Sequence, residues 1–159
     1  MLRHCPKAVR LTMTAAVLLS GPALAETRNA EPPKEVAMTR IHMIIGNETL
    51  SATLDDTPAG RDFSMLLPLE LSLSDYHATE KIADLPRALD TRDAPASYTP
   101  KAGDITYYTP WGNLAIFYKP FRPSNGLVRL GAFDGPIDAL MKDGPIAVRI
   151  EAAEKQDGF

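Results

Sequence analysis

Two short alternating segments joined by a tight turn constrain the fold more than any other part of this sequence. Apolar side chains alternate with Thr, Tyr, Ala or Phe through residues 105–108 and again through 114–118, which is the period-2 pattern of paired β-strands. Pro110 presets the backbone for a turn, and Gly112 can take the left-handed conformation that closes it. The pattern predicts a β-hairpin that carries Trp111, the only tryptophan, at its tip.

Similar alternation elsewhere predicts more strands. These strands are expected over residues 39–45, 48–54, 69–74, 126–133 and 146–150. Residues 75–102 lack a clear period, so we expect residues 76–87 to pack across the mouth of a barrel and residues 90–100 to be mobile.

Two short helices are predicted between the strands. Thr57 and Pro58 are typical of a helix start, and Pro68 stops any long continuation, with Arg61 and Asp62 expected on or beside the outer face. A second helix is expected over residues 137–141, with Gly144 as its C-terminal cap.

The order of these elements predicts the fold class. The helices are not placed as crossovers between parallel strands, so the chain is expected to be mostly β, with an antiparallel sheet. Closing that sheet into a small barrel would remove exposed edges, and the two short peripheral helices would cover the barrel ends.

The N-terminus has the three parts of a secretory signal peptide. Arg3, Lys7 and Arg10 precede an apolar run over residues 11–19, and Ala-Leu-Ala at residues 23–25 fits a cleavage site. We therefore predict four segments and a periplasmic location, with a retained N-terminal anchor as the alternative. The segments are a signal peptide (1–25), a disordered linker (26–37), the barrel domain (38–152) and a flexible tail (153–159).

The composition after cleavage excludes several classes of protein. The single cysteine, Cys5, lies in the leader, which excludes a disulfide scaffold, thiol catalysis and a cysteine zinc site. Losing Arg3, Lys7 and Arg10 leaves 14 basic against 20 acidic residues, a net charge of −6. This acidity argues against nucleic acid and anionic lipid as partners. The sequence has no second apolar run of comparable length, so we expect no integral membrane segment after cleavage.

Several motifs within residues 39–151 together resemble the bacterial cyclophilin-like-fold domains. The matching stretches are Thr57-Pro58-Ala59-Gly60-Arg61-Asp62-Phe63, Leu66-Leu67-Pro68, Asp75-Tyr76, Thr79-Glu80-Lys81, Leu85-Pro86-Arg87, and Gly103-Asp104 through Tyr118. The resemblance implies a cyclophilin-type β-barrel with peripheral helices. It does not imply isomerase activity, because the Phe-His-Arg and Gln-Gly-Gly-Asp segments of true cyclophilins are missing from the sequence.

Charged and aromatic side chains are the candidates for a ligand site. An arginine fork suits a carboxylate or peptide carbonyls, and aromatic side chains on one strand face can line a groove. The ligand-binding candidates are Arg61, Tyr76, Glu80, Arg87, Tyr108, Trp111 and Arg129.

Each candidate also has a purely structural interpretation. Arg61 can be a solvated helix residue, and Arg87 or Arg129 can pair with Glu80 or Asp75 to hold the long loop. The aromatic residues can fill the core, and Trp111 can pack on Pro110 or near Pro86.

The sequence indicates neither a metal nor a cofactor. His42 and His77 are the only histidines beyond the leader, and their spacing does not require a shared metal site. The serines lack a nucleophile-elbow context, and the chain has no phosphate-binding glycine loop.

These observations predict a non-catalytic module that binds a small molecule or an extended peptide in a groove near Tyr76, Arg87, Tyr108 and Trp111. The alternative is a peptidyl-prolyl cis-trans isomerase with a non-standard site, in which Arg61 or Arg87 replaces the usual arginine and donates to the proline nitrogen.

Overall fold

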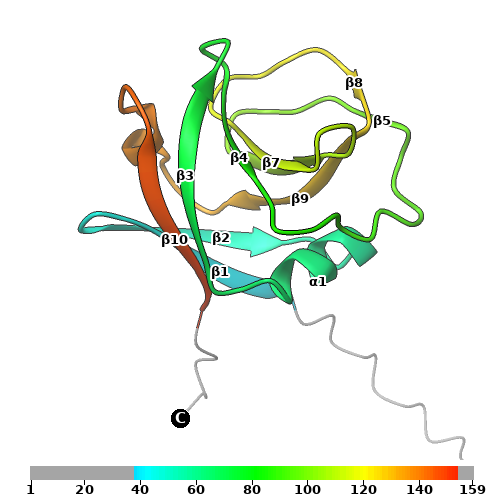
Figure 1. Cartoon of the computed structure of the whole chain (residues 1–159), viewed down its shortest axis with the longest axis horizontal. Helices are drawn as coiled ribbons and strands as arrows, with labels where there is room; N and C mark the ends of the chain where they lie inside the picture. Colours follow the sequence, from blue (N-terminus) through cyan, green and yellow to red (C-terminus); the bar gives the residue numbers. More distant parts are fainter. Residues whose placement is uncertain (1–37, 154–159) are drawn as a thin grey trace, which may run out of the picture. The chain divides into compact units, whose positions relative to one another are not determined.

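A closed barrel of eight antiparallel strands forms the domain (Figure 1). The computed structural model describes residues 38–153, so the expected signal peptide, the linker and residues 154–159 of the tail lie outside the described part. Around the barrel the strands follow the order β1-β10-β3-β4-β7-β6-β9-β2. Their bounds are β1 Thr39–Ile45, β2 Glu48–Leu54, β3 Leu69–Tyr76, β4 Glu80–Asp84, β6 Asp104–Tyr108, β7 Asn113–Phe117, β9 Leu127–Phe133 and β10 Ile146–Ala152.

The predicted hairpin is confirmed as β6 and β7. Tyr108 and Asn113 face each other as the last pair before the turn. Gly112 has φ of +70°, and its N–H donates to the Tyr108 carbonyl at 2.9 Å. This left-handed residue lets the chain reverse within the few residues after Pro110.

The first predicted helix is present as α1 (Pro58–Ser64), which packs against the barrel (Figure 1). Thr57 caps it by accepting a hydrogen bond from the Gly60 N–H at 3.1 Å, as the sequence indicates. Ala59 and Phe63 enter the core. Asp62 was expected near the outer face, but it is only 8% exposed because it receives hydrogen bonds from the loop that packs over the helix.

The second predicted helix is wrong in type. Residues Asp138–Met141 form one 3₁₀ turn, η1, so the described domain has one α-helix instead of two. Only four residues adopt helical geometry before the chain extends at Lys142, which leaves no room for a run of α-helical hydrogen bonds. Gly144 has φ of +78° and lies in the turn before β10, beyond the end of η1.

Part of the region without a clear period is also a barrel strand. We expected residues 76–87 to cross the barrel mouth, but β4 pairs with β3 on one side and with β7 on the other. A buried lysine hides the strand pattern: Lys81 is 2% exposed, and its amine donates to the Lys142 carbonyl at 2.9 Å. In the segment expected to be mobile, Ser97–Tyr98 form β5, which pairs with β8 (Ser124–Asn125).

The barrel wall separates two apolar clusters. The larger cluster fills the barrel interior, where Ile41, Met43, Leu114 and Ile116 are fully buried. The smaller cluster lies on the other side of β7 and contains Ala115, Phe117 and Leu127. All five residues of β7 are therefore buried: Leu114 and Ile116 face the interior, and Asn113, Ala115 and Phe117 face the outer side of the wall.

Candidate functional site

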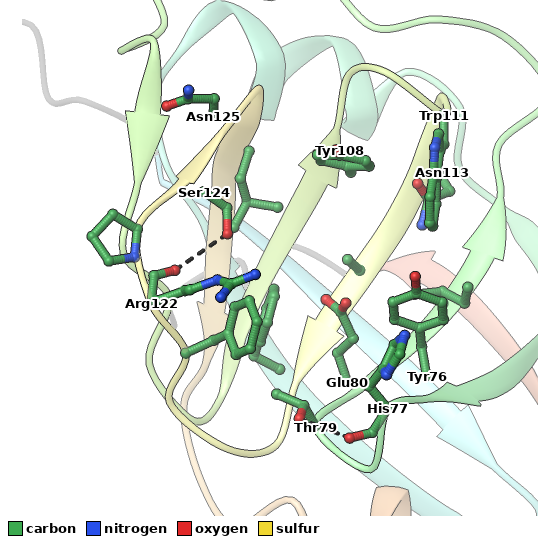
Figure 2. Close-up of a pocket in the computed structure, with 16 residues that line it drawn as sticks. Tyr76, His77, Thr79, Glu80, Tyr108, Trp111, Asn113, Arg122, Ser124 and Asn125 are labelled. Atoms are coloured by element: carbon green, nitrogen blue, oxygen red, sulfur yellow. Dashed lines mark hydrogen bonds between the residues drawn. The ribbon is translucent and has the colours of Figure 1, made fainter.

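A large pocket lies against the outer wall of the barrel, beside the smaller apolar cluster (Figure 2). Its volume is about 730 Å³. The β3, β4, β6 and β7 strands supply one wall, and residues 121–125 supply the facing wall. The pocket exists because β7 presents apolar side chains on both faces, so that the outer face needs a cover of its own.

Strand register determines which side chains meet in this pocket. Glu80 lies directly opposite Tyr76 on β3 and opposite Phe117 on β7. Further along the wall, Tyr108 lies opposite Asn113. All five side chains line the pocket, and neighbouring strands bring them together from positions that are distant in sequence.

Three aromatic rings form one end of the pocket. The Tyr76 and Trp111 ring centroids are 5.6 Å apart, and those of Tyr108 and Trp111 are 5.3 Å apart. Both tyrosine rings stand at 86° to the indole, which is the edge-to-face geometry favoured by aromatic quadrupoles. Trp111 is 57% exposed, and these two tyrosines are its aromatic ring partners.

Glu80 is the perturbed acid of the pocket. Its side chain is partly buried, and burial raises its pKa to about 7 because desolvation disfavours the charged form. Within residues 38–153 no hydrogen bond or ion pair offsets this effect. A partly buried carboxylate without a partner in a cleft is a common feature of binding and catalytic sites.

Asn113 contributes a second polar group without a partner. The residue is 3% exposed, and its Nδ2 donates to the Leu114 carbonyl at 3.2 Å. Its Oδ1 accepts no hydrogen bond from the part of the chain that the structure describes. Since nearly all buried polar atoms in proteins are hydrogen-bonded, this oxygen is an unsatisfied acceptor in the described structure.

The three candidate arginines lie outside the pocket and pair with aspartates. Arg61 pairs with the exposed Asp56, and Arg129 pairs with Asp55 and, at 3.5 Å, with Asp104. Arg87 donates two hydrogen bonds to Asp62, at 2.8 and 2.7 Å. These bonds hold the pKa of Asp62 below its usual range. The expected pairing of Arg87 or Arg129 with Glu80 or Asp75 is therefore wrong, because aspartates on or next to α1 lie closer.

Four of the seven candidate residues thus converge, namely Tyr76, Glu80, Tyr108 and Trp111, and three arginines do not. The sequence analysis missed Asn113 and Arg122, which both line the pocket. An uninterrupted apolar run from Leu114 to Phe117 was the available signal that β7 is covered on both faces. No sequence signal indicates that the Asn113 oxygen would lack a partner.

The histidines are separated in the fold. His77 lines the pocket and packs edge to face on Tyr76, with centroids 4.2 Å apart, whereas His42 lies on β1. Among residues 38–153, no group of three or more His, Cys, Asp or Glu side chains is arranged to hold a metal ion. The same residues contain no helix long and apolar enough to cross a membrane.

Comparison with known proteins gives a family and a fold neighbour. The sequence model of the Cyclophilin-like family matches residues 43–151. The solution structure of a hypothetical protein from Archaeoglobus fulgidus is similar with a TM-score of 0.56 and 16% identity, covering 73% of this chain and 95% of the archaeal chain. At that identity the likeness concerns the fold alone. No curated protein is similar enough in sequence to count as a relative.

Proposed function

The chain belongs to the cyclophilin-like family, and we propose that it is a non-catalytic module that binds a small molecule or an extended peptide in the outer-wall pocket. One observation carries this proposal: the pocket combines three aromatic rings with two polar groups, the Glu80 carboxyl and Asn113 Oδ1, that have no hydrogen-bond partner within residues 38–153. Apolar walls with a few convergent polar groups are typical of small-molecule sites. The pocket volume, about 730 Å³, lies within the range that is usual for small-molecule sites.

The pocket chemistry supports binding more than catalysis. Its titratable side chains include one carboxyl, one imidazole and one exposed guanidinium, from Glu80, His77 and Arg122. Covalent catalysis requires a nucleophile that is hydrogen-bonded to a base. The described residues that line the pocket contain no such pair. The aromatic end instead offers a rigid contact surface whose hydroxyl and indole groups can also reach polar atoms.

Tryptophan fluorescence provides a direct test of binding, because Trp111 is the only tryptophan. Purified protein is titrated with a library of metabolites and short peptides, and both the emission and the melting temperature are followed. We expect at least one compound to shift both quantities. A Tyr108→Ala variant, which loses a pocket ring, should abolish the shift, whereas an Arg61→Ala variant outside the pocket should keep it. A library that moves neither quantity would contradict the proposal.

The isomerase alternative is less well supported, because neither of its two proposed arginines lines the pocket. Arg61 pairs with Asp56, and Arg87 pairs with Asp62. An NMR exchange measurement on Ala-Pro peptides separates the two functions. We expect the cis-trans exchange rate to equal the uncatalysed rate. A cis-trans exchange rate that the wild-type protein increases, and that Arg61→Ala or Arg87→Ala does not, would support the isomerase function instead.

We also propose that the protein is exported to the periplasm. The support is the arrangement of Arg3, Lys7 and Arg10 before the apolar run, followed by the small residues at 23–25. N-terminal sequencing of the protein from a periplasmic fraction should begin at residue 26. Recovery of uncleaved chain with the cytoplasmic fraction would argue against export.

A further inference from the structure

We propose that the aromatic end of the pocket recognises an organic ammonium group, and this inference rests on the proposed binding function. Tyr76, Tyr108 and Trp111 would surround the cation, Glu80 would supply the counter-charge, and Asn113 Oδ1 would accept an N–H hydrogen bond. The recognised chemistry is therefore a protonated amine attached to an apolar body. Either a free amine or the amino terminus of a peptide can present it.

The arrangement of the three rings suits a cation. Two tyrosine rings stand perpendicular to one indole at 5.6 and 5.3 Å, so that ring faces and edges enclose a corner. Figure 2 shows the Glu80 carboxylate pointing into the hollow beside these rings. Aromatic faces attract cations within about 6 Å of the ring centroid, most strongly for Trp, and cages of this kind bind ammonium ligands.

The polar groups at this end of the pocket also favour a cation. Glu80 and Asn113 Oδ1 are both acceptors, and neither has a partner within the described residues. The Asn113 amide nitrogen already donates to the Leu114 carbonyl at 3.2 Å, so its oxygen is the atom that is left over. Two unused acceptors beside aromatic faces select a donor with positive charge over an anion or a neutral acceptor.

Apolar side chains line the pocket wall beyond the rings. Ile82 and Ala115 continue the wall beyond the rings, and Phe117 stacks on Phe121 with centroids 6.2 Å apart. This surface suits an apolar or aromatic ligand body. The ligand class that fits both ends is an aralkyl amine or an N-terminal aromatic residue.

Binding of such a cation is expected to depend on pH. Burial raises the pKa of Glu80 to about 7, so the carboxyl is largely neutral at pH 6 and largely ionised at pH 8. The groups facing it are Tyr76 from β3, His77 from the β3–β4 turn, Tyr108 from β6 and Arg122 from the covering loop, while Phe117 on β7 is apolar. Among the described residues that line the pocket, Glu80 is the single carboxyl group, so its ionisation adds the negative charge that attracts the cation as pH rises.

Calorimetry with three matched probes tests the proposal on the full-length protein. The probes are 2-phenylethylamine, its N,N,N-trimethyl derivative and 2-phenylethanol. At pH 8 the amine should bind at least about tenfold more tightly than the alcohol. Wild-type affinity for the amine should fall about tenfold between pH 8 and pH 6, in proportion to the ionised fraction of Glu80.

Two variants isolate the groups responsible. Glu80→Gln should remove the advantage of the amine over the alcohol together with the pH dependence. His77→Asn should keep the pH dependence. Phenylalanine amide and its N-acetyl derivative distinguish a free amine from a peptide amino terminus as the natural ligand. A site for peptide amino termini should bind phenylalanine amide more tightly than 2-phenylethylamine and should not bind the N-acetyl derivative.

The outcomes separate this inference from the proposed function. Equal affinity for amine and alcohol overturns ammonium recognition while the pocket remains a binding site. Tighter binding of the trimethyl probe than of the amine overturns the role of Asn113 as an acceptor. If the protein binds a compound of the library but none of these probes, the ammonium inference alone is overturned. If it binds neither the probes nor any compound of the library, the proposed binding function is overturned as well.

Discussion

Trp111, at the tip of the β6–β7 hairpin, lies edge to face against Tyr76 at the end of β3, with the ring centroids 5.6 Å apart. The contact links two strands that are not neighbours in the barrel, since β4 and β7 lie on the path between β3 and β6. The indole therefore reaches across the wall of the pocket while more than half of its surface stays exposed.

Trp111→Ala should therefore weaken ligand binding far more than folding. Loss of two edge-to-face contacts by an exposed residue should cost about 1 to 2 kcal/mol of unfolding free energy. Phe63→Ala, at a fully buried core position, should cost about 3 to 5 kcal/mol. Urea denaturation of both variants measures the difference. A Trp111→Ala cost equal to that of Phe63→Ala would remove Trp111 from the binding surface and make it a structural residue.

Gly112→Ala should destabilise the protein through backbone strain. Gly112 has φ of +70°, and an added Cβ would have only the Tyr107 hydroxyl within 4 Å, at 3.8 Å. The cost should be about 1 to 2 kcal/mol, the usual penalty for a side chain in the left-handed region. Gly135→Ala is the matched control, because an added Cβ meets nothing within 4 Å there and the backbone is not left-handed. Equal denaturation midpoints for the two variants would contradict the role of the turn.

The hairpin was predictable because its determinants are local. Alternation, Pro110 and Gly112 all lie within one short stretch, and the structure confirms the strands and the turn. β4 was not predictable, because the position that breaks its pattern, Lys81, is buried with a partner distant in sequence, the Lys142 carbonyl, and also pairs with Asp75. Its pattern makes sense only once the barrel has closed.

The candidate site was partly predictable for the same reason. The aromatic residues and Glu80 were recognisable by residue type, but the sequence does not say that strand register would place Glu80 beside Tyr76 and Phe117. The arginines were equally plausible as a residue type. Their exclusion depends on Asp55, Asp56 and Asp62, which cluster around α1 and neutralise them there.

Arg87→Ala should destabilise the protein more than Arg61→Ala at neutral pH. Arg87 is the bidentate partner of Asp62, which is buried, whereas Arg61 and Asp56 form an exposed pair. Removing Arg87 leaves a buried carboxylate with a single remaining donor, the Asp90 N–H at 2.7 Å. Exposed pairs contribute little. Thermal melts at pH 7 should rank the variants in this order, and equal melting temperatures would contradict it.

The same pair predicts a pH dependence with a definite sign. The pKa of Asp62 is lowered in the folded protein, first by the Arg87 hydrogen bonds, so the unfolded chain binds the proton at a higher pH. The stability from this pair is present above the unfolded pKa of about 4 and is lost as pH falls through the folded pKa. The difference in melting temperature between wild type and Arg87→Ala should therefore shrink in acid. A difference that grows as pH falls would contradict the assignment.

Glu80→Gln should stabilise the protein above neutral pH. The folded pKa of Glu80, about 7, lies above the ordinary value of 4.5, so the folded state holds a proton that the unfolded state has already released between these two pH values. Stability from this group is therefore full below the unfolded pKa and decreases as pH rises toward 7. The neutral amide avoids the loss, and with allowance for partial exposure the gain at pH 8 should be about 1 to 2 kcal/mol. Chemical denaturation at pH 5 and pH 8 measures it.

A stabilising substitution that also abolishes amine binding would identify Glu80 as a residue that is unfavourable for folding and useful for binding, a trade-off common at functional sites. Glu70→Gln is the control, because Glu70 lies outside the pocket and pairs on the surface with Arg149 at 3.1 Å. It should change stability little at either pH. If Glu80→Gln instead lowers stability at pH 8, then the Glu80 carboxylate makes favourable contacts in the folded protein. It would then not be an unpaired charge available to bind a cation.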